Sequence, residues 1–411
     1  MSASNFTEST EQAEFRAQCA KWFANNGPGV ADFDIPYFWA MLRNNDQVDY
    51  FRNWQRKLYE GGIIGCDYPV EYGGAGLKKC QAIANQEMKK VGALYTVSYV
   101  GLALAAPMLL FHAQEELKAE LLPKIFSGEH LWCQGFSEPD FGSDLVSMQT
   151  SAVKEGDKWR INGHKVWTSM AQYADWMFVV CRTDKNDKYG GLTFFILPVK
   201  EHIDKGVTIN PLIKISGEAG FNEVLFDDVI IPDRYRIDEV GAGWKVVQTV
   251  LAHERGSGKM QMPSYDTQPG EAAIFNSPYS LLKLVKESER YGVKASEDPI
   301  IRERLAKLVM KQVAFRNLHR RARVQTLCEN PLRLTLQMKV NMTEMVQESG
   351  ALAVEMQGAT SSLSVGDTNA PHKGEAMFSY FDSFGLTIAG GTNEIQRNIL
   401  GEKILDLPKT K

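Results

Sequence analysis

Apolar residues follow a helical spacing along the first third of the chain. Between Glu11 and Glu129 they gather on single helical faces, as at Leu102, Met108 and Leu109, and Gly and Pro interrupt the pattern. Such a period is typical of amphipathic helices that bury one side. We therefore predict an α-helical domain over residues 1–130.

Short runs of β-branched and aromatic residues replace this period in the middle of the chain. They occupy Trp176–Thr183, Leu192–Val199 and Asn222–Ile231. Asn162-Gly163 stands between two further apolar stretches and is a strong signal for a hairpin turn. This pattern predicts a β-domain over residues 131–240.

The helical period returns towards the end of the chain, from Gly243 to Gly401, with a long stretch over Arg302–Leu327. Several Pro and Gly residues within 262–298 indicate a loop-rich insertion with one helix starting at Ser277-Pro278. We expect a helical domain over 241–411. The order of helices, strands and helices predicts an α+β protein.

Composition and charge exclude several classes of protein. The chain has 411 residues, 44% of them hydrophobic, and can bury a large core. Its 46 basic and 50 acidic residues give a formal charge of −4, so we expect no nucleic-acid partner. No targeting segment or long apolar run is present, which predicts a cytoplasmic protein outside the membrane. The Cys and His residues show no metal-ligand spacing, so no metal is expected.

Two segments in the strand region carry side chains suited to ligand binding. The loop GFSEPDFGSD, Gly135–Asp144, can present backbone N–H groups and the Ser137 and Ser143 hydroxyls to an anionic or carbonyl-rich ligand. It can equally be an ordinary surface loop. HKVWTS, His164–Ser169, puts an indole beside two hydroxyls, a combination that suits stacking on a flat ring, although Trp in a strand is usually core.

Together these segments resemble motifs of the acyl-CoA dehydrogenase family. That family carries a T/S-E-P-x-x-G-S-D loop, then an N-G hairpin and a K-x-W strand, matched here by SEPDFGSD and INGHKVWTS. Three further segments resemble its other motifs in the same order: Pro69–Gly76, Phe221–Pro232 and Gly390–Leu405. The resemblance runs from about Phe15 to Leu405.

The resemblance implies an N-terminal α-helical domain, a middle β-domain of the barrel or sandwich type and a C-terminal four-helix bundle. It implies a flavoprotein that binds FAD and removes a hydride and a proton from an acyl-CoA, giving the trans-2-enoyl-CoA in fatty-acid or related acyl catabolism. The partners it implies are the acyl-CoA substrate, an electron-transferring flavoprotein as acceptor, and further copies in a homotetramer or dimer of dimers.

Residue by residue, the resemblance also implies which side chains of the β-domain bind the cofactor. Ser137 and Ser169 would hydrogen-bond the edge of the isoalloxazine ring, and Trp167 would pack against it. Ser143 would approach the pyrophosphate or the CoA.

The same carry-over assigns cofactor contacts in the C-terminal part. Thr392 and Gln396 would help hold FAD. Gly358, in EMQGATS, resembles a glycine turn that touches the FAD of a neighbouring subunit, and Arg302 stands near where the family places an arginine for that FAD.

The catalytic base departs from the commonest pattern of the family. Most members carry a glutamate immediately before the G-T of the C-terminal motif, where this chain has Gly390, whose backbone N–H can still donate to the thioester oxygen. A smaller branch keeps its glutamate on the first bundle helix, before an arginine. GWKVVQTVLAHERG places Glu254 and Arg255 there, so we predict Glu254 as the base and Arg255 as a substrate contact. The alternative is a solvated or salt-bridged pair at a helix end.

Other readings of the same motifs stay open. One is an acyl-CoA oxidase, or a flavoenzyme of this fold that does not desaturate. Another is a non-catalytic subunit of a hetero-oligomeric acyl-CoA dehydrogenase whose partner chain supplies the base. Gly256, Ser257 and Gly258 weaken the helix after Glu254, and the break could make room for a bulky or ring-bearing acyl group.

Overall fold

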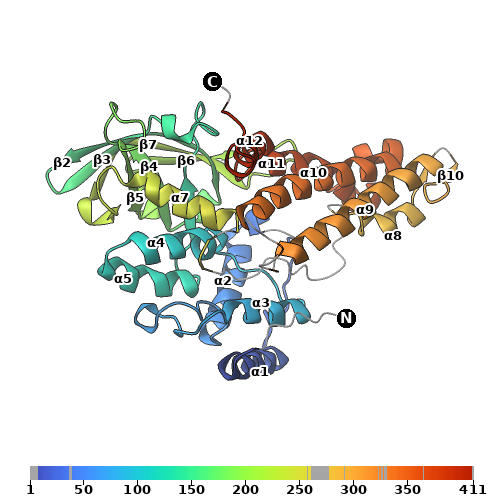
Figure 1. Cartoon of the computed structure of the whole chain (residues 1–411), viewed down its shortest axis with the longest axis horizontal. Helices are drawn as coiled ribbons and strands as arrows, with labels where there is room; N and C mark the ends of the chain where they lie inside the picture. The colour runs from blue at the N-terminus through green and yellow to red at the C-terminus, as the bar shows by residue number, and fades with distance from the viewer. Residues whose placement is uncertain are drawn as a thin grey trace. The chain divides into compact units, whose positions relative to one another are not determined.

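The computed structural model describes residues 8–36, 39–256, 258–260, 277–290, 292–322, 324, 327, 331–363 and 365–409. They form two compact units (Figure 1). The first unit lies within Met1–Ile213, Ala219–Glu254 and Gly258–Gly270, and the second within Lys214–Glu218, Arg255–Ser257 and Glu271–Lys411. Among the described residues, no helix combines the length and the apolar character needed to cross a bilayer.

The first unit begins with the predicted helical part. Its α-helices are α1 Thr10–Asn25, α2 Asn45–Glu60, α3 Gln81–Lys90, α4 Ala106–His112 and α5 Glu115–Phe126, and a π-helix over Val100–Ala105 leads into α4. Ser9 and Asn44 cap α1 and α2, because each side chain accepts a backbone N–H of the first turn. Phe51 and Trp54 on α2 are buried in the core.

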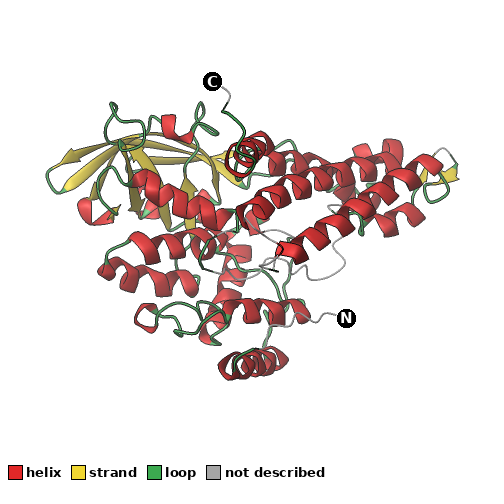
Figure 2. Cartoon of the chain, viewed as in Figure 1, coloured by secondary structure: helices red, strands yellow, loops and turns green. Residues whose placement is uncertain are grey.

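The sheet of the first unit follows these helices in the chain. Figure 2 shows its strands in yellow. Its strands are β1 Trp132–Gly135, β2 Ser151–Glu155, β3 Lys158–Ser169, β4 Trp176–Arg182, β5 Leu192–Leu197, β6 Val207–Leu212, β7 Phe221–Pro232 and β8 Arg236–Ile237. Their order is β6-β7-β3-β2-β4-β5-β8, with β1 parallel to β4, and a short helix α6, Val199–His202, follows β5. Every residue of β4 and β5 is buried, as their continuous apolar runs indicate. The three predicted strand runs are confirmed.

The predicted hairpin turn at Asn162-Gly163 is wrong, because both residues lie inside β3. The turn that joins β2 to β3 is Gly156-Asp157, with Gly156 at φ +63°. Gly163 is required for a different reason: a Cβ added there would lie 2.6 Å from the Cα of Thr150. The pairing with β7 shifts register between Ile161 and Gly163, so the N-G signal marks a bulge rather than a turn.

The last helix of the first unit, α7, spans Gly243–Glu254. Asp238 and His112 hold its outer face: His112 Nδ1 lies 3.0 Å from Asp238 Oδ2, and its Nε2 lies 2.8 Å from Thr249 Oγ1 on α7. Lys245 of α7 donates to the same Asp238 oxygen over 2.8 Å. Burial would raise the pKa of Asp238, but the hydrogen bonds from Lys245 and His112 lower it to about 2.

The second unit is helical, as predicted for the C-terminal part. Its helices are α8 Leu281–Glu287, α9 Pro299–Ala322, α10 Pro331–Gln357, α11 Glu375–Ile388 and α12 Asn393–Ile404. Ion pairs Arg304–Glu355 and Lys311–Glu348 show that α9 and α10 run antiparallel. The helical bundle architecture is confirmed, and the numerical boundaries of the three predicted domains stay a prediction.

Much of the predicted insertion, residues 261–276, lies outside the described residues. Its described part holds α8, which begins after a turn over Ser277–Ser280, and a two-stranded sheet of β9 Glu289–Arg290 and β10 Val293–Lys294.

Candidate functional site

Trp167, near the end of β3, has an unusual backbone for a bulky residue. Its φ is +61°, in the left-handed region that costs an L-residue roughly 1–2 kcal/mol. The register with β7 shifts between Lys165 and Thr168, and this bulge turns the indole outward, where it is 60% exposed. The edge of the ring meets Phe221, 5.9 Å away between centroids. A strained backbone that displays an aromatic ring to solvent indicates a binding role rather than a core role.

Two hydroxyls accompany this indole. Ser137 and Ser169 are half-buried, and neither hydroxyl hydrogen-bonds another described residue, nor does the Trp167 indole N–H. The Ser137 carbonyl accepts the N–H of Val166 over 2.9 Å, which fixes the loop beside β3. A flat apolar ring with unused hydroxyls nearby fits the isoalloxazine of FAD, which has two faces for packing and a polar edge.

The loop after Ser137 borders a cationic cavity. Ser143 is exposed, and Lys188 Nζ lies 3.4 Å from the carboxylate of its neighbour Asp144. A cavity of about 310 Å³ adjoins this ion pair, and its lining includes Lys185 and Ser147 as well as Lys188. Ammonium groups and a hydroxyl on one rim suit a phosphate-bearing ligand.

A buried ion pair lies under the same loop and was not predicted from the sequence. Lys165 is fully buried on β3, and its Nζ lies 2.8 Å from Glu138 Oε1. Burial would raise the pKa of the Glu138 carboxyl, but the charge and hydrogen bond of Lys165, together with the Thr150 and Gln149 donors, lower it. Glu138 lies in the motif SEPDFGSD and Lys165 in the motif HKVWTS, and their opposite charges were the sequence signal that could have pointed to the pair.

Glu254, the predicted base, is the last residue of α7 and is half-buried. Burial, and after it the negative charge of Glu254, raises the pKa of Tyr99 to about 12. Tyr99 precedes the π-helix and stacks on Trp39 at 5.3 Å between centroids. The Glu254 carboxylate is thus half-buried and close enough to Tyr99 to act on its phenol, which differs from a fully solvated helix end. π-helices are rare and concentrate at functional sites, and the sequence carries no signal for this one.

In the second unit, Arg255 and the C-terminal motif come together. A Cβ on Gly391 would lie 3.4 Å from Arg255 Nη2 and 3.0 Å from Gln396 Nε2, so both side chains pack against that glycine. Gln396 Nε2 donates to the Gly390 carbonyl over 2.9 Å, and Thr392 caps α12 by accepting the Ile395 N–H.

This cluster contains polar groups without partners. Arg255 Nε and Gln396 Oε1 are buried and make no hydrogen bond within the described residues. The Gly390 N–H likewise donates to no other residue that the structure describes, and Gly390 has φ +66°. Buried polar atoms of folded proteins are nearly always bonded, so an unused donor and an unused acceptor close together make the Gly390 turn a candidate ligand site.

Lys339 of α10 adds a further positive charge that the sequence did not reveal. Its Nζ donates to Asn393 Oδ1 over 2.7 Å and to the Thr387 carbonyl over 3.2 Å. Burial lowers the pKa of Lys339, and the positive charges of Arg255 and Arg397 act in the same direction. The lysine fixes the start of α12 under the Gly390 turn.

Arg302 and Gly358 lie away from this cluster. Arg302 is exposed at the start of α9 and donates to the Ser296 carbonyl over 2.9 Å, and Gly358, at φ +59°, follows the end of α10. Glu355, beside that end, is separated from Lys339 by roughly 24 Å at 1.5 Å per helical residue. The structure therefore does not bring Arg302 and Gly358 to the residues of the Gly390 turn.

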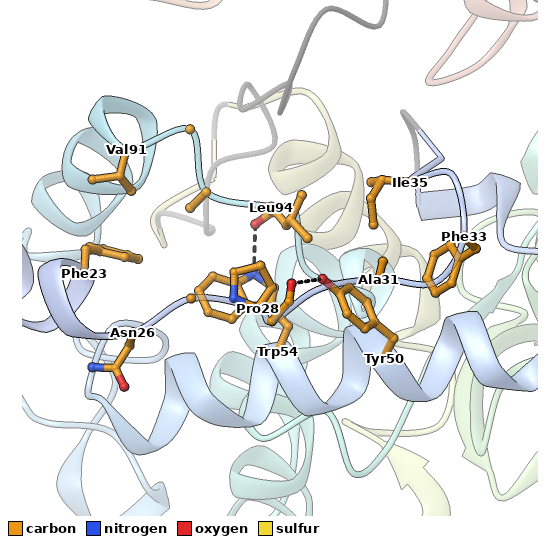
Figure 3. Close-up of a pocket in the computed structure, with 14 residues that line it drawn as sticks. Phe23, Asn26, Pro28, Ala31, Phe33, Ile35, Tyr50, Trp54, Val91 and Leu94 are labelled. Atoms are coloured by element: carbon orange, nitrogen blue, oxygen red, sulfur yellow. Dashed lines mark hydrogen bonds between the residues drawn. The ribbon is translucent and has the colours of Figure 1, made fainter.

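A larger cavity, of about 420 Å³, lies in the N-terminal helical part and includes none of the predicted site residues (Figure 3). Aromatic side chains such as Tyr50 and Trp54 line it, and their polar atoms are already used. Trp54 Nε1 donates to the Leu94 carbonyl over 3.1 Å, and Tyr50 donates to the Gly29 carbonyl over 2.9 Å. We therefore assign no catalytic or cofactor-binding role to this cavity.

Comparison with known proteins gives consistent matches along the whole chain. Residues 9–129, 133–229 and 241–405 match the N-terminal, middle and C-terminal domains of acyl-CoA dehydrogenase, respectively. The chain is 34% identical to acyl-CoA dehydrogenase IpdE1 of Mycolicibacterium smegmatis, over 97% of this chain and 98% of that protein. It is 32% identical to IpdE1 of Mycobacterium tuberculosis, over 96% and 98% of the two chains.

Two solved structures share the fold at 25% identity. One is the ChsE4-ChsE5 complex from Mycobacterium tuberculosis, with a TM-score of 0.74 and coverage of 99% of this chain and 100% of that one. The other is a steroid ACAD, Tcur3481-Tcur3483, with a TM-score of 0.73 and coverage of 98% and 99%.

Proposed function

The chain belongs to the acyl-CoA dehydrogenase family of FAD-binding oxidoreductases, and from this premise we propose that it desaturates an acyl-CoA thioester to the trans-2-enoyl-CoA. One observation carries the proposal. Glu254, a half-buried carboxylate, is followed directly by Arg255, whose buried Nε has no partner among the described residues and whose guanidinium packs on the Gly390-Gly391 turn. A base, a cation and a free backbone donor are the groups that proton removal beside a carbonyl requires.

Each group has one task in this proposal. Glu254 accepts the proton from the substrate α-carbon. The Gly390 N–H donates to the thioester oxygen, which gains negative charge as that proton leaves, and Arg255 contacts the acyl-CoA. FAD supplies the acceptor for the hydride of the β-carbon.

The cofactor and the CoA are held by the remaining predicted residues. Ser137, Ser169 and Trp167 hold the isoalloxazine, and Thr392 and Gln396 contact FAD from the C-terminal motif. Arg302 and Gly358 serve the FAD of a neighbouring subunit, which agrees with their separation from the Gly390 turn.

We further propose that the cationic cavity beside Ser143 binds phosphate groups of the CoA. Lys185 and Lys188 line the cavity and supply the charge, and Ser147 on the same lining supplies a hydroxyl. Ser143 precedes Asp144, the ion-pair partner of Lys188. An electron-transferring flavoprotein is the proposed electron acceptor.

A bulky, ring-bearing acyl group is the substrate class that we favour. α7 ends at Glu254, and Gly256 has φ +70°, so the chain turns away from the helix axis directly after the base. One structural relative, Tcur3481-Tcur3483, is named as a steroid ACAD, which supports the same class.

A second candidate is a role as one subunit of a mixed oligomer, rather than of a homotetramer. Gly390 removes the carboxylate from its common position, and the names of both structural relatives join two different chains. In that case a partner chain supplies the base or completes the flavin site.

The substitution Glu254→Gln tests the proposal. It keeps the size of the side chain but removes the base. The rate of dehydrogenation, measured by the bleaching of the flavin absorbance, should therefore fall by roughly 10²–10⁴-fold while FAD stays bound. Glu239, whose side chain is 88% exposed, provides the matched control Glu239→Gln, which should keep wild-type activity. Full activity of Glu254→Gln removes Glu254 from the role. A wild-type chain that becomes active only with a partner chain supports the mixed oligomer.

A further inference from the structure

The Lys165 ammonium has an acceptor for each of its three protons. Its Nζ donates to the Phe136 carbonyl over 3.1 Å, to Glu138 Oε1 over 2.8 Å and towards Met148 Sδ over 3.6 Å. All three acceptors come from the segment that follows β1, whereas Lys165 belongs to β3. One buried side chain therefore ties this segment to the strand that carries Trp167.

The Glu138 carboxylate is equally saturated. Its Oε2 accepts the Gln149 N–H over 2.7 Å, and its Oε1 accepts the Thr150 N–H over 2.9 Å in addition to Lys165. The backbone of Glu138 exchanges two hydrogen bonds with Phe141, each 3.1 Å long, which closes the turn between them. The carboxylate thus fixes both ends of the loop that contains Ser143.

The pair lies directly next to the strained bulge. Val166 donates its N–H to the Ser137 carbonyl, and Trp167, the next residue, adopts φ +61°. On the far side of the bulge, Asn222 Nδ2 donates to the Thr168 carbonyl over 3.2 Å. A non-glycine residue stays in this conformation only where its surroundings hold it, and the ion pair provides the support on the side of the loop.

We propose that the buried Lys165–Glu138 pair is a positioning device for the flavin, which sets the Ser137 loop against the Trp167 bulge so that both meet the isoalloxazine ring. The inference rests on the proposed function, because it takes FAD as the ligand of these residues. Neither side chain is exposed, so both act through the segments that they hold and neither touches the ring.

The test compares FAD affinity with the stability of the apoprotein. Lys165→Met combined with Glu138→Gln removes both buried charges at similar volume, so that no unpaired charge is left. Glu138→Asp keeps the charge but shortens the side chain, so it cannot reach Lys165 and the Gln149–Thr150 backbone together. Arg160→Ala is the matched control. It breaks an ion pair on the surface of the same strand, in which Arg160 Nε lies 2.7 Å from Glu155 Oε1 on the neighbouring strand.

We expect both pair variants to raise the Kd for FAD at least tenfold and to change the visible spectrum of the flavin bound at saturation. The apoprotein of the double variant should unfold at urea concentrations close to the wild-type midpoint, because no unpaired buried charge is left in it, and Arg160→Ala should keep the Kd within twofold. A pair variant with the wild-type Kd and spectrum overturns the proposal, whatever its stability, because a purely structural pair predicts that result.

If the variants do not fold, a measurement on the wild-type protein tests the positioning role of the pair. Hydrogen exchange of the Gln149, Thr150 and Val166 amides should slow at least fivefold when FAD is added to the apoprotein, and unchanged exchange overturns the positioning role. Failure of the proposed function looks different, because it shows as full activity of Glu254→Gln or as a wild-type chain that binds FAD but does not desaturate an acyl-CoA, and neither result depends on the pair variants.

Discussion

Replacing Trp167 by glycine should separate the binding role of this residue from any role in the fold. The substitution removes the exposed indole and relieves the left-handed backbone at φ +61°. We expect the apoprotein to keep nearly all of its stability while its affinity for FAD falls. For a tryptophan buried in the core, the same substitution would mainly lower the stability of the apoprotein and leave its affinity for FAD unchanged.

Three contributions to the free energy of unfolding nearly cancel at this position. Relief of the left-handed conformation stabilises the variant by roughly 1–2 kcal/mol. The conformational freedom of glycine in the unfolded chain costs about 0.5–1 kcal/mol, and loss of the edge-to-face contact with Phe221 costs about 0.5–1.5 kcal/mol. The net change should stay within about 1.5 kcal/mol, because the ring is 60% exposed and buries little further surface.

Urea unfolding of the apoprotein and fluorescence titration with FAD measure the two effects. The Kd for FAD should rise roughly tenfold, which is about 1.4 kcal/mol. Trp159 lies on the same strand but is only 3% exposed, so Trp159→Ala should destabilise the apoprotein by roughly 3–5 kcal/mol. The reasoning is refuted if Trp167→Gly destabilises the apoprotein as much as Trp159→Ala, or if it binds FAD with wild-type affinity.

Three further predictions concern the CoA cavity, the support of α7 and the interior of β3. The double variant Lys185→Ala, Lys188→Ala should raise KM for acyl-CoA roughly tenfold in steady-state assays, most at low salt, with the Kd for FAD unchanged. Asp238→Asn should lower the free energy of unfolding at pH 7 by roughly 2 kcal/mol. Because the folded pKa of Asp238 is depressed to about 2, urea titrations should show this difference above about pH 4 and its loss as the pH falls towards 2. Gly163→Ala should cost roughly 1–3 kcal/mol in urea unfolding through overpacking, whereas Gly142→Ala, with nothing within 4 Å of the added Cβ, should be close to neutral.

The order of helices, strands and helices could be predicted from the sequence because each part has its own hydrophobic period. β4 and β5 were recognisable since their apolar runs are continuous and entirely buried. The N-G pair misled because it is a local signal, and the close approach of Thr150 that requires Gly163 comes from a segment outside β3. Local turn statistics contain no information about such a contact.

The candidate site was predictable only where motifs carry it. Trp167 and Ser137 stand in motifs, but the left-handed backbone of the tryptophan depends on a bulge that two strands create together. Lys165 and Lys339 were missed because a lysine normally indicates an exposed position. Their burial depends on acceptors that the fold brings from distant segments, Glu138 in one case and Asn393 in the other.

The saturated pair under the Ser137 loop also limits how this sequence can evolve. Losing Glu138 or Lys165 alone leaves the other charge buried and unpaired, which typically costs roughly 3–5 kcal/mol. Divergence at these positions therefore has to pass through paired replacement. If the pair positions the flavin, a paralogue that has lost both charges together should bind FAD weakly, and sequence comparison can identify such chains for measurement.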